Sequence, residues 1–148
     1  MKFSSSIEYA IHSLIYISRN GGAAPVLVAD VARAINVSET YLRKVFQQLV
    51  RTGLLMSQRG VNGGFFFSRP ASEITLKDVV EAVDGSLPSY ICMRKQKRCS
   101  ISLDCPVKRE FARAQARMAE VLDATSIKEL DVEIAESIEA PNWIRVHA

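Results

Sequence analysis

Apolar residues recur every three to four positions in the first part of the chain, and this spacing predicts three helices. The first is expected over 4–19, where Asn20 and two glycines end it. The second is short and covers 28–35. The third follows Ser38, a suitable N-cap, and ends at Thr52 and Gly53. Its buried stripe is predicted to consist of Leu42, Val45, Phe46, Leu49 and Val50.

The pattern changes to strand-like runs at 54–59 and 65–69. They flank five residues that include Asn62-Gly63, and Asn-Gly between two such runs is a strong hairpin signal. Ser72 or Thr75 is then expected to cap a helix that Gly85 ends. After an irregular stretch, the spacing predicts a long amphipathic helix over 106–123 and a short one over 126–138.

Helix, helix, turn, helix and hairpin is the element order of a winged helix-turn-helix, a mainly α fold with a small β-hairpin wing. We expect a DNA-binding domain over 1–85, a loop over 86–105, and a dimerisation helix with an acidic tail over 106–148. Apolar residues in the long helix alternate at steps of four and three, as a helix–helix seam needs. They are Val107, Phe111, Ala114, Met118 and Val121. The alternative is that this stripe packs on its own domain.

A polar face remains on the third helix once its apolar stripe is buried, and the hairpin adds a second surface for DNA. The helix would enter the major groove by its N-terminal end, and Arg59 would suit a narrow minor groove. A polar helix face alone is often only solvated, but the adjoining hairpin favours DNA contact. The residues predicted to contact DNA are Ser38, Thr40, Tyr41, Arg43, Lys44, Gln47, Arg51, Arg59, Gly60, Asn62, Gly63 and Gly64.

Composition and charge narrow the class of protein. The chain has 148 residues, of which 48% are hydrophobic and 24% charged, as in a globular protein. Residues 1–60 carry seven basic and three acidic groups, whereas 123–148 carry two and six, so the first part can face phosphates. We expect no membrane span and no signal peptide, hence a cytoplasmic protein. The tail beyond 131 could lie against a partner or be loose.

An enzyme is not expected. His12 and His147 stand far apart and outside any catalytic motif, and the glycine-rich hairpin lacks the lysine of a phosphate loop.

The three cysteines of the chain, Cys92, Cys99 and Cys105, lie within one short segment. Four basic residues stand between the first two and would partly offset the charge of thiolates: Arg94, Lys95, Lys97 and Arg98. Such a group can hold an iron–sulfur cluster, bind zinc or form a reversible disulfide. The sequence leaves these three chemistries open.

Several short motifs together resemble the Rrf-two family of bacterial winged-helix transcriptional regulators. They are Tyr9-Ala10, Tyr41-Leu42, Gly53-Leu54 and Ser57-x-Arg59-Gly60-x-x-Gly63-Gly64-Phe65. The resemblance is to the cluster-binding, three-cysteine members (IscR-, NsrR- and RirA-like). It implies a homodimer held by the long helix, a near-palindromic double-stranded DNA operator and, most often, repression.

The resemblance also implies a 2Fe–2S or 4Fe–4S cluster on Cys92, Cys99 and Cys105, although many relatives have one residue fewer between the first two. Some members take a fourth ligand from a histidine three residues after the third cysteine, where this chain has Lys108. Others use a carboxylate early in the partner's first helix, where Glu8 stands. His12, one turn on, is a second candidate.

Glu8 has a simpler alternative role, because a carboxylate near a helix N-terminus stabilises the helix dipole. With a cluster, the protein would respond to iron, nitric oxide, oxygen or redox state. The alternative function is a cluster-free thiol switch or a zinc-containing regulator of the same family.

Overall fold

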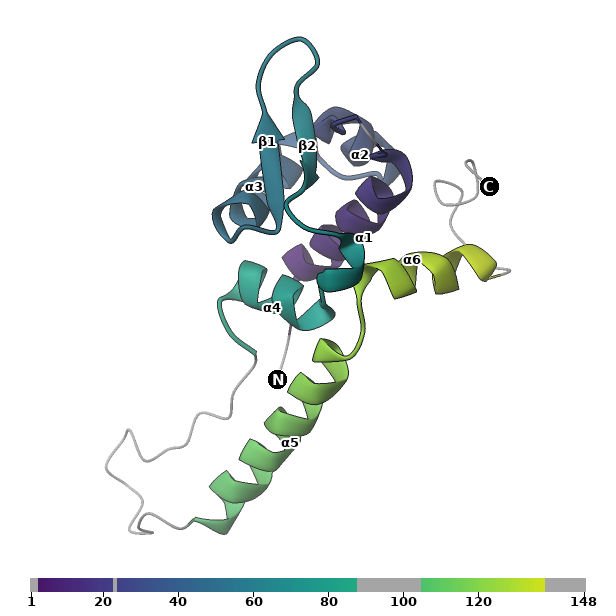
Figure 1. Cartoon of the computed structure of the whole chain (residues 1–148). Coiled ribbons are helices and arrows are strands. Elements are labelled where there is room, and N and C mark those ends of the chain that lie inside the picture. The colour runs from purple at the N-terminus through teal and green to yellow at the C-terminus, as the bar shows by residue number, and fades with distance from the viewer. Residues whose placement is uncertain (1–2, 23, 88–104, 138–148) are drawn as a thin grey trace.

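The computed structural model describes residues 3–22, 24–87 and 105–137, which form helices around a core and a two-stranded wing (Figure 1). In chain order the elements are α1 (Ser5–Asn20), α2 (Val28–Ala34), α3 (Glu39–Arg51), β1 (Leu55–Gln58), β2 (Gly64–Phe67), the 3-10 turn η1 (Ala71–Glu73), α4 (Leu76–Asp84), α5 (Pro106–Asp123) and α6 (Ile127–Glu136). The predicted mainly α fold with a hairpin wing is confirmed. Cys92 and Cys99 lie outside the described residues.

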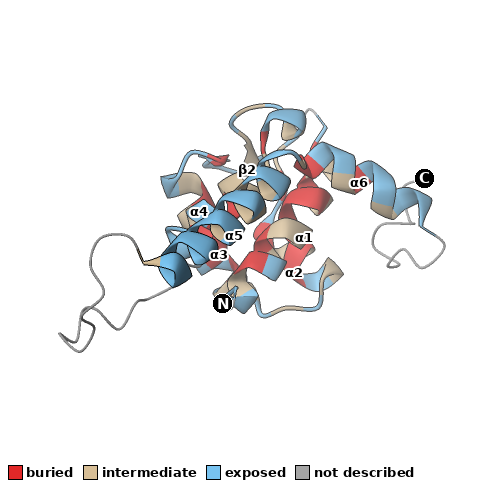
Figure 2. Ribbon diagram, turned by 90° about the horizontal axis from the view of Figure 1, so that it is seen from below, coloured by how far each residue is buried: buried red, intermediate tan, exposed pale blue. Residues whose placement is uncertain are grey.

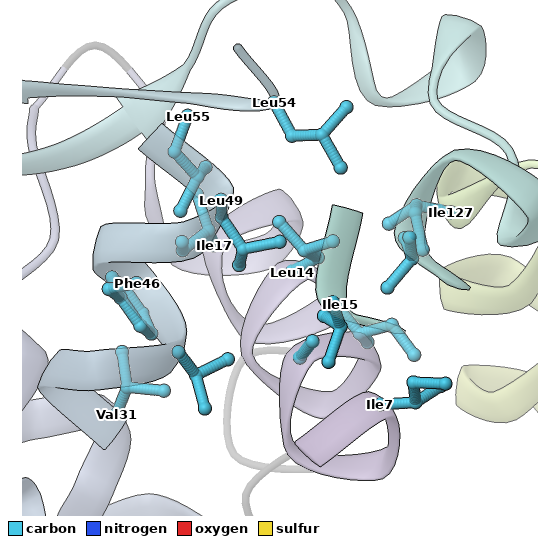
Figure 3. Close-up of a cluster of buried hydrophobic side chains, with 14 of the residues drawn as sticks. Ile7, Leu14, Ile15, Ile17, Val31, Phe46, Leu49, Leu54, Leu55 and Ile127 are labelled. Carbon is cyan, nitrogen blue, oxygen red and sulfur yellow. The ribbon is translucent and has the colours of Figure 1, made fainter. Parts of the chain in front are cut away.

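Helix α1 is the centre of the core, because it contacts α3, α4 and α6. Leu14 and Ile15 have no exposed surface, and burying side chains of this size stabilises a fold by roughly 1.5–3 kcal/mol each. Figure 3 shows Phe46 and Leu49 of α3 and Ile127 of α6 in the same cluster. Helix α3 is therefore positioned by packing against α1 and not by local propensity alone.

Helix α3 follows the predicted pattern closely. Leu42, Val45, Phe46 and Leu49 are buried, while Val50 is only half-buried. Ser38 occupies the N-cap position, but its side chain makes no capping hydrogen bond.

The predicted wing is present, and its loop has the expected five residues, shifted by one position. Strands β1 and β2 pair antiparallel from Leu55–Phe67 to Gln58–Gly64, which leaves five residues, 59–63, in the loop. The sequence did not predict a further pairing at the base of the wing. There Val26 and Phe65 exchange two backbone hydrogen bonds, each of 2.9 Å.

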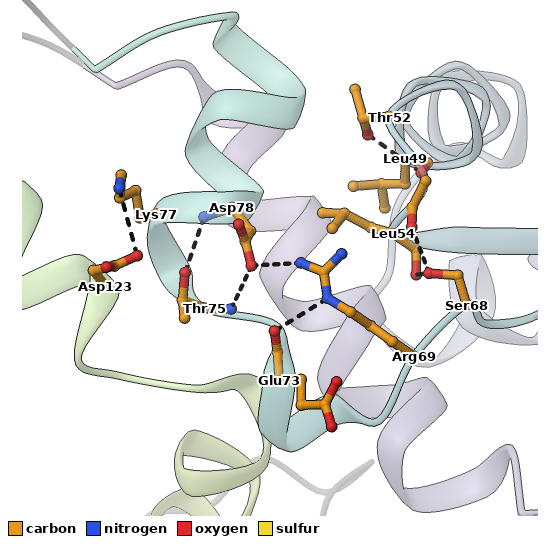
Figure 4. Close-up of polar contacts among 11 residues, drawn as sticks. Leu49, Thr52, Leu54, Ser68, Arg69, Glu73, Thr75, Lys77, Asp78 and Asp123 are labelled. Atoms are coloured by element: carbon orange, nitrogen blue, oxygen red, sulfur yellow. Dashed lines mark hydrogen bonds and ion pairs between the residues drawn. The ribbon is translucent and has the colours of Figure 1, made fainter.

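Helix α4 begins with a capping box at Thr75, and not at Ser72, which lies in η1. The Thr75 hydroxyl accepts from the Asp78 backbone N–H at 3.2 Å, and the Asp78 carboxylate accepts from the Thr75 N–H at 3.0 Å. Arg69 donates to the same carboxylate at 2.7 Å and to the Glu73 carbonyl at 3.1 Å (Figure 4). These bonds fix the connection between the wing and α4.

Helix α5 projects from the body, and none of its residues is fully buried (Figures 1 and 2). Met118 and Leu122, near its end, pack against the core, so part of the apolar stripe does lie on its own domain. Val107, Phe111 and Val121 remain exposed. The end of the helix is also tied to α4 by Lys77 and Asp123, whose Nζ and Oδ1 are 3.6 Å apart.

Helix α6 packs against α1, so residues 131–136 are held to the domain and are not loose, whereas 138–148 lie outside the described residues. Asp131 is 2% exposed, and its Oδ1 lies 2.5 Å from Nε of Arg19. Ser18 donates to Oδ2 at 2.9 Å, and Lys128 lies 3.1 Å from that oxygen. The buried charge is thus paired with two cations, and Oδ2 accepts hydrogen bonds from Ser18 and Lys128, whereas Oδ1 has the ion pair with Arg19 but no hydrogen bond among the described residues.

Candidate DNA interface and metal-ligand residues

The outer face of α3 presents the side chains predicted to meet DNA. Those that are exposed are Ser38, Thr40, Arg43, Lys44, Gln47 and Arg51. Arg43 is paired with Glu39 one turn earlier, its Nε donating to Oε1 at 3.0 Å. An exposed pair of this kind contributes only about 0.3–0.5 kcal/mol, so Arg43 remains available to a phosphate or a base.

Tyr41 is the exception on this face, because it is half-buried against α1. Its hydroxyl lies 2.6 Å from the Ser6 hydroxyl, and its ring meets the Tyr9 ring edge-on at 5.5 Å. The two tyrosines that mark the family resemblance therefore hold α3 to α1. A DNA contact from Tyr41 stays a prediction, and this structural role was missed because nothing in the sequence pairs positions 9 and 41.

The wing exposes Arg59, Gly60 and Asn62, whereas Gly63 and Gly64 have roles inside the fold. A Cβ on Gly63 would come within 2.5 Å of the Gln58 carbonyl oxygen. A Cβ on Gly64, whose φ is +154°, would come within 2.7 Å of the Val26 oxygen. Gly63 is therefore needed to close the loop, and Gly64 to let the wing pack against the segment around Val26. Both roles are independent of DNA contact.

A groove lies between the start of α1, α4 and the end of α5, with a volume of about 460 Å³. Both candidates for a fourth ligand, Glu8 and His12, line it. The rest of the lining is largely apolar and comes from Phe3, Ser4, Ser5, Ile7, Ile11, Leu76, Val80 and Leu122.

Cys105 is the N-cap residue of α5 and is half-buried, so its sulfur stands beside the positive end of a helix dipole. Lys108, in the first turn of α5, is exposed. Among the described residues no three His, Cys, Asp or Glu side chains gather as a metal site, and two of the three cysteines lie outside that part of the chain.

Glu8 and Cys105 of one chain are far apart. The groove holding Glu8 adjoins Leu122 at the end of α5, whereas Cys105 precedes the start of that helix. Its 18 residues at 1.5 Å each span about 27 Å. One chain therefore cannot bring both residues to the same metal in this conformation.

The fold and the exposed face of α3 define the class of protein: a winged helix-turn-helix DNA-binding protein. The chain belongs to the Rrf2 family, whose model, described as "Iron-dependent Transcriptional regulator", matches residues 3–132. Protein aau3 of Rhizobium meliloti is 35% identical over 131 residues, which make up 88% of this chain and 84% of aau3. The regulator IscR of Escherichia coli is 34% identical over 95 residues, which cover 64% of this chain and 59% of IscR.

Solved structures agree with this assignment. CymR, described as the global cysteine regulator of B. subtilis, superposes with a TM-score of 0.75 at 27% identity, covering 90% of this chain and 98% of CymR. IscR of T. potens gives a TM-score of 0.71 at 23% identity over 93% and 92% of the two chains, which supports the fold alone. The oxidised form of Staphylococcus aureus CymR gives 0.68 at 26% identity, over 88% of this chain and 96% of that one.

The predicted family is therefore confirmed, and the chain is a DNA-binding transcriptional regulator and not an enzyme. The residues proposed to contact DNA or ligate metal stay predictions. Within the described residues, no helix has the length and apolar composition that crossing a bilayer requires.

Proposed function

We propose that this protein is an iron–sulfur-cluster-sensing transcriptional regulator. It acts in the cytoplasm as a homodimer on a near-palindromic operator, and it represses transcription, the most frequent mode in this family. The observation that carries the proposal is that Cys105 stands at the start of the projecting helix α5, whereas Glu8 of α1 lines a groove beside the far end of that helix. The three cysteines would be ligands from one subunit, and Glu8 would come from the other.

The exposed apolar face of α5 supports a dimer. Val107 is 51% and Val121 67% exposed, and Phe111 lies between them. Pairing two copies of α5 antiparallel would cover these side chains. The same pairing would bring Cys105 of one subunit towards the Leu122 end of the other, and so towards the partner groove with Glu8.

The described donors suit an iron–sulfur cluster. A thiolate at a helix N-terminus is a favourable soft ligand for iron, and a carboxylate can complete a set of three sulfurs. The cluster, when bound, would supply a group sensitive to iron supply, oxygen and nitric oxide. An oxygen ligand from Glu8 would leave one iron more exchangeable than a fourth thiolate would, while the exposed Lys108 offers no ligand when protonated.

A change at the sulfurs can reach DNA through the end of α5. Residues 74–76 and 125–127 are joined by backbone hydrogen bonds of 2.9 Å (Leu76 N–H to Thr125 O) and 2.8 Å (Ile127 N–H to Ile74 O). Since α4 in turn contacts α3, a change in α5 pairing would alter the separation of the two recognition helices. Such coupling requires two arrangements of the dimer with different affinities for DNA.

The first test is the iron, acid-labile sulfide and visible spectrum of protein purified without oxygen. We expect iron and sulfide in near-equal amounts, with thiolate-to-iron absorption. Protein that carries zinc, or no metal under reducing conditions, would refute a resident cluster.

The second test locates Glu8 in the dimer. Glu8→Ala and Cys105→Ser chains carrying different affinity tags are co-expressed, and the mixed dimer is isolated. If ligands come from both subunits, one site of the mixed dimer combines the cysteines of the Glu8→Ala chain with Glu8 of the Cys105→Ser chain and is complete. The mixed dimer then regains about half the wild-type iron, whereas neither homodimer has a complete site. A mixed dimer no better than the homodimers would show that Glu8 does not act across the interface.

A thiol–disulfide switch is the second candidate, favoured by the similarity to Staphylococcus aureus CymR, one solved structure of which is an oxidised form. It predicts that oxidant and reductant alone change operator affinity in metal-free protein. Alkylating all three thiols should abolish that response, and a redox response that survives alkylation would exclude this mechanism.

A further inference from the structure

Figure 1 shows that strands β1 and β2 are joined by a loop that extends away from the helices. Val61 belongs to this loop, which follows Gln58 and precedes Gly64. The exposed fraction of its side chain is 104%, the largest among the exposed large apolar side chains of the described residues. An isolated apolar residue on a surface is ordinary, so exposure alone carries no argument. The position of Val61 is what matters. It lies two residues from Arg59, on the surface that is predicted to enter the minor groove.

The loop that carries Val61 is held by backbone contacts. Gly63 N–H donates to the Gly60 carbonyl at 3.0 Å, which closes a tight turn around Val61 and Asn62. At the base of the wing, Phe65 meets the Phe46 ring of α3 edge-on with centroids 4.9 Å apart. The valine is therefore presented at a fixed place relative to the recognition helix.

We infer that Val61 is an apolar reader of the DNA minor groove, packing against the deoxyribose walls beside Arg59 and disfavouring a G·C pair beneath it. In this groove A·T pairs show only acceptors, which Arg59 can satisfy, whereas G·C adds the guanine N2 amino donor. Valine has no acceptor, so covering that amino group removes its water without replacing the hydrogen bond. The inference rests on the proposed wing–DNA contact.

The test uses the full-length protein, with and without cluster, on an operator selected from random DNA. Hydroxyl-radical footprinting identifies the base pairs that face the wing, and A·T, G·C and inosine·C are compared there. Inosine lacks the N2 amino group but still pairs with cytosine. Wild type should bind inosine·C and A·T alike and G·C roughly tenfold more weakly, the scale of one unfavourable base pair.

Two variants separate the missing hydrogen-bond acceptor from the apolar contact. Val61→Thr keeps the side-chain size but adds an acceptor, so the preference for inosine·C over G·C should fall to within roughly threefold, given the modest worth of one hydrogen bond. Val61→Ala should weaken binding to every operator without changing its salt dependence, because no phosphate contact is lost. Val132 is an exposed valine on α6, and Val132→Ala is the matched control. It should change neither the preference for inosine·C over G·C nor the affinity for the operators.

The inference is wrong if Val61→Thr retains the wild-type preference for inosine·C. It is also wrong if Val61→Ala binds like wild type, for instance because the tip of the wing meets a protein and not DNA. Failure of the underlying function looks different: wild type would then select no DNA in either form, or Arg59→Ala would bind with unchanged affinity and salt dependence.

Discussion

Asp131 is a buried carboxylate that links two helices of the fold through its ion pairs and hydrogen bonds. It joins α6 to α1 through Arg19 and Ser18, pairs with Lys128 of its own helix, and is almost fully buried. A buried ion pair adds little net stability, but removing one partner leaves the other charge desolvated. The cost of a substitution here therefore depends on how deeply the removed partner is buried.

Arg19→Met should lower the free energy of unfolding by about 3 kcal/mol, because Arg19 is the better buried cation beside Asp131. Lys128→Met should lower it by less than about 1 kcal/mol, because Lys128 is half exposed to water. Urea unfolding of the two variants measures the difference. Equal losses would mean that the Arg19 contact does not form in solution.

Lys44 lies on the exposed face of α3 with its charge available to a phosphate. Lys44→Ala should reduce the slope of log K against log salt by about one unit per subunit, since one fewer counterion is released. Binding titrations across a range of salt concentrations give the slope. Lys128→Ala, remote from that face, should leave it unchanged, and an unaltered slope in Lys44→Ala would rule out the contact.

At the scale of elements, α6 owes its start to the capping box of Ser126 and Glu129. The Glu129 carboxylate accepts from the Ser126 N–H at 2.7 Å and from its hydroxyl at 2.8 Å. These hydrogen bonds lower the pKa of Glu129 below its usual value of 4.5. Since the folded pKa is the lower one, the bonds stabilise the fold above that usual value and lose their effect as pH falls through the lowered pKa.

Glu129→Ala should therefore be less stable than wild type at pH 7, and the gap should narrow when the pH falls below about 4.5. Thermal unfolding followed by circular dichroism across this pH range measures the gap. Glu133→Ala, on the exposed part of the same helix, is the control and should show little difference at any pH. A gap independent of pH would show that the carboxylate does not cap α6.

At the scale of the whole molecule, α5 is an element without a full packing partner inside the described part of one chain. Phe111→Asp should convert the proposed dimer to monomers and weaken operator binding by more than about 30-fold, the effect of losing a hot spot of about 2 kcal/mol. Sedimentation velocity and operator titration give the two quantities.

Val132→Asp, which places the same charge on exposed α6, should remain dimeric. A dimeric Phe111→Asp protein with normal DNA affinity would show that α5 does not form the interface.

The sequence by itself determined the elements, because apolar period, caps and turn residues are local properties. It predicted α1 to α4, the hairpin and α5 to within a few residues, and the exposed face of α3 follows directly from burying its apolar stripe. It missed η1 and the pairing of Val26 with Phe65 at the base of the wing, since no local pattern relates these two positions.

Only the tertiary structure decided which residues meet across the chain. The pairing of Tyr9 with Tyr41 and of Arg19 with Asp131 joins positions that no periodicity relates. The same holds for Glu8 and Cys105: both were chosen from the sequence, but their separation along α5 makes a shared metal site depend on a second subunit. Local pattern sets what each element is, and packing in three dimensions sets which elements can act together.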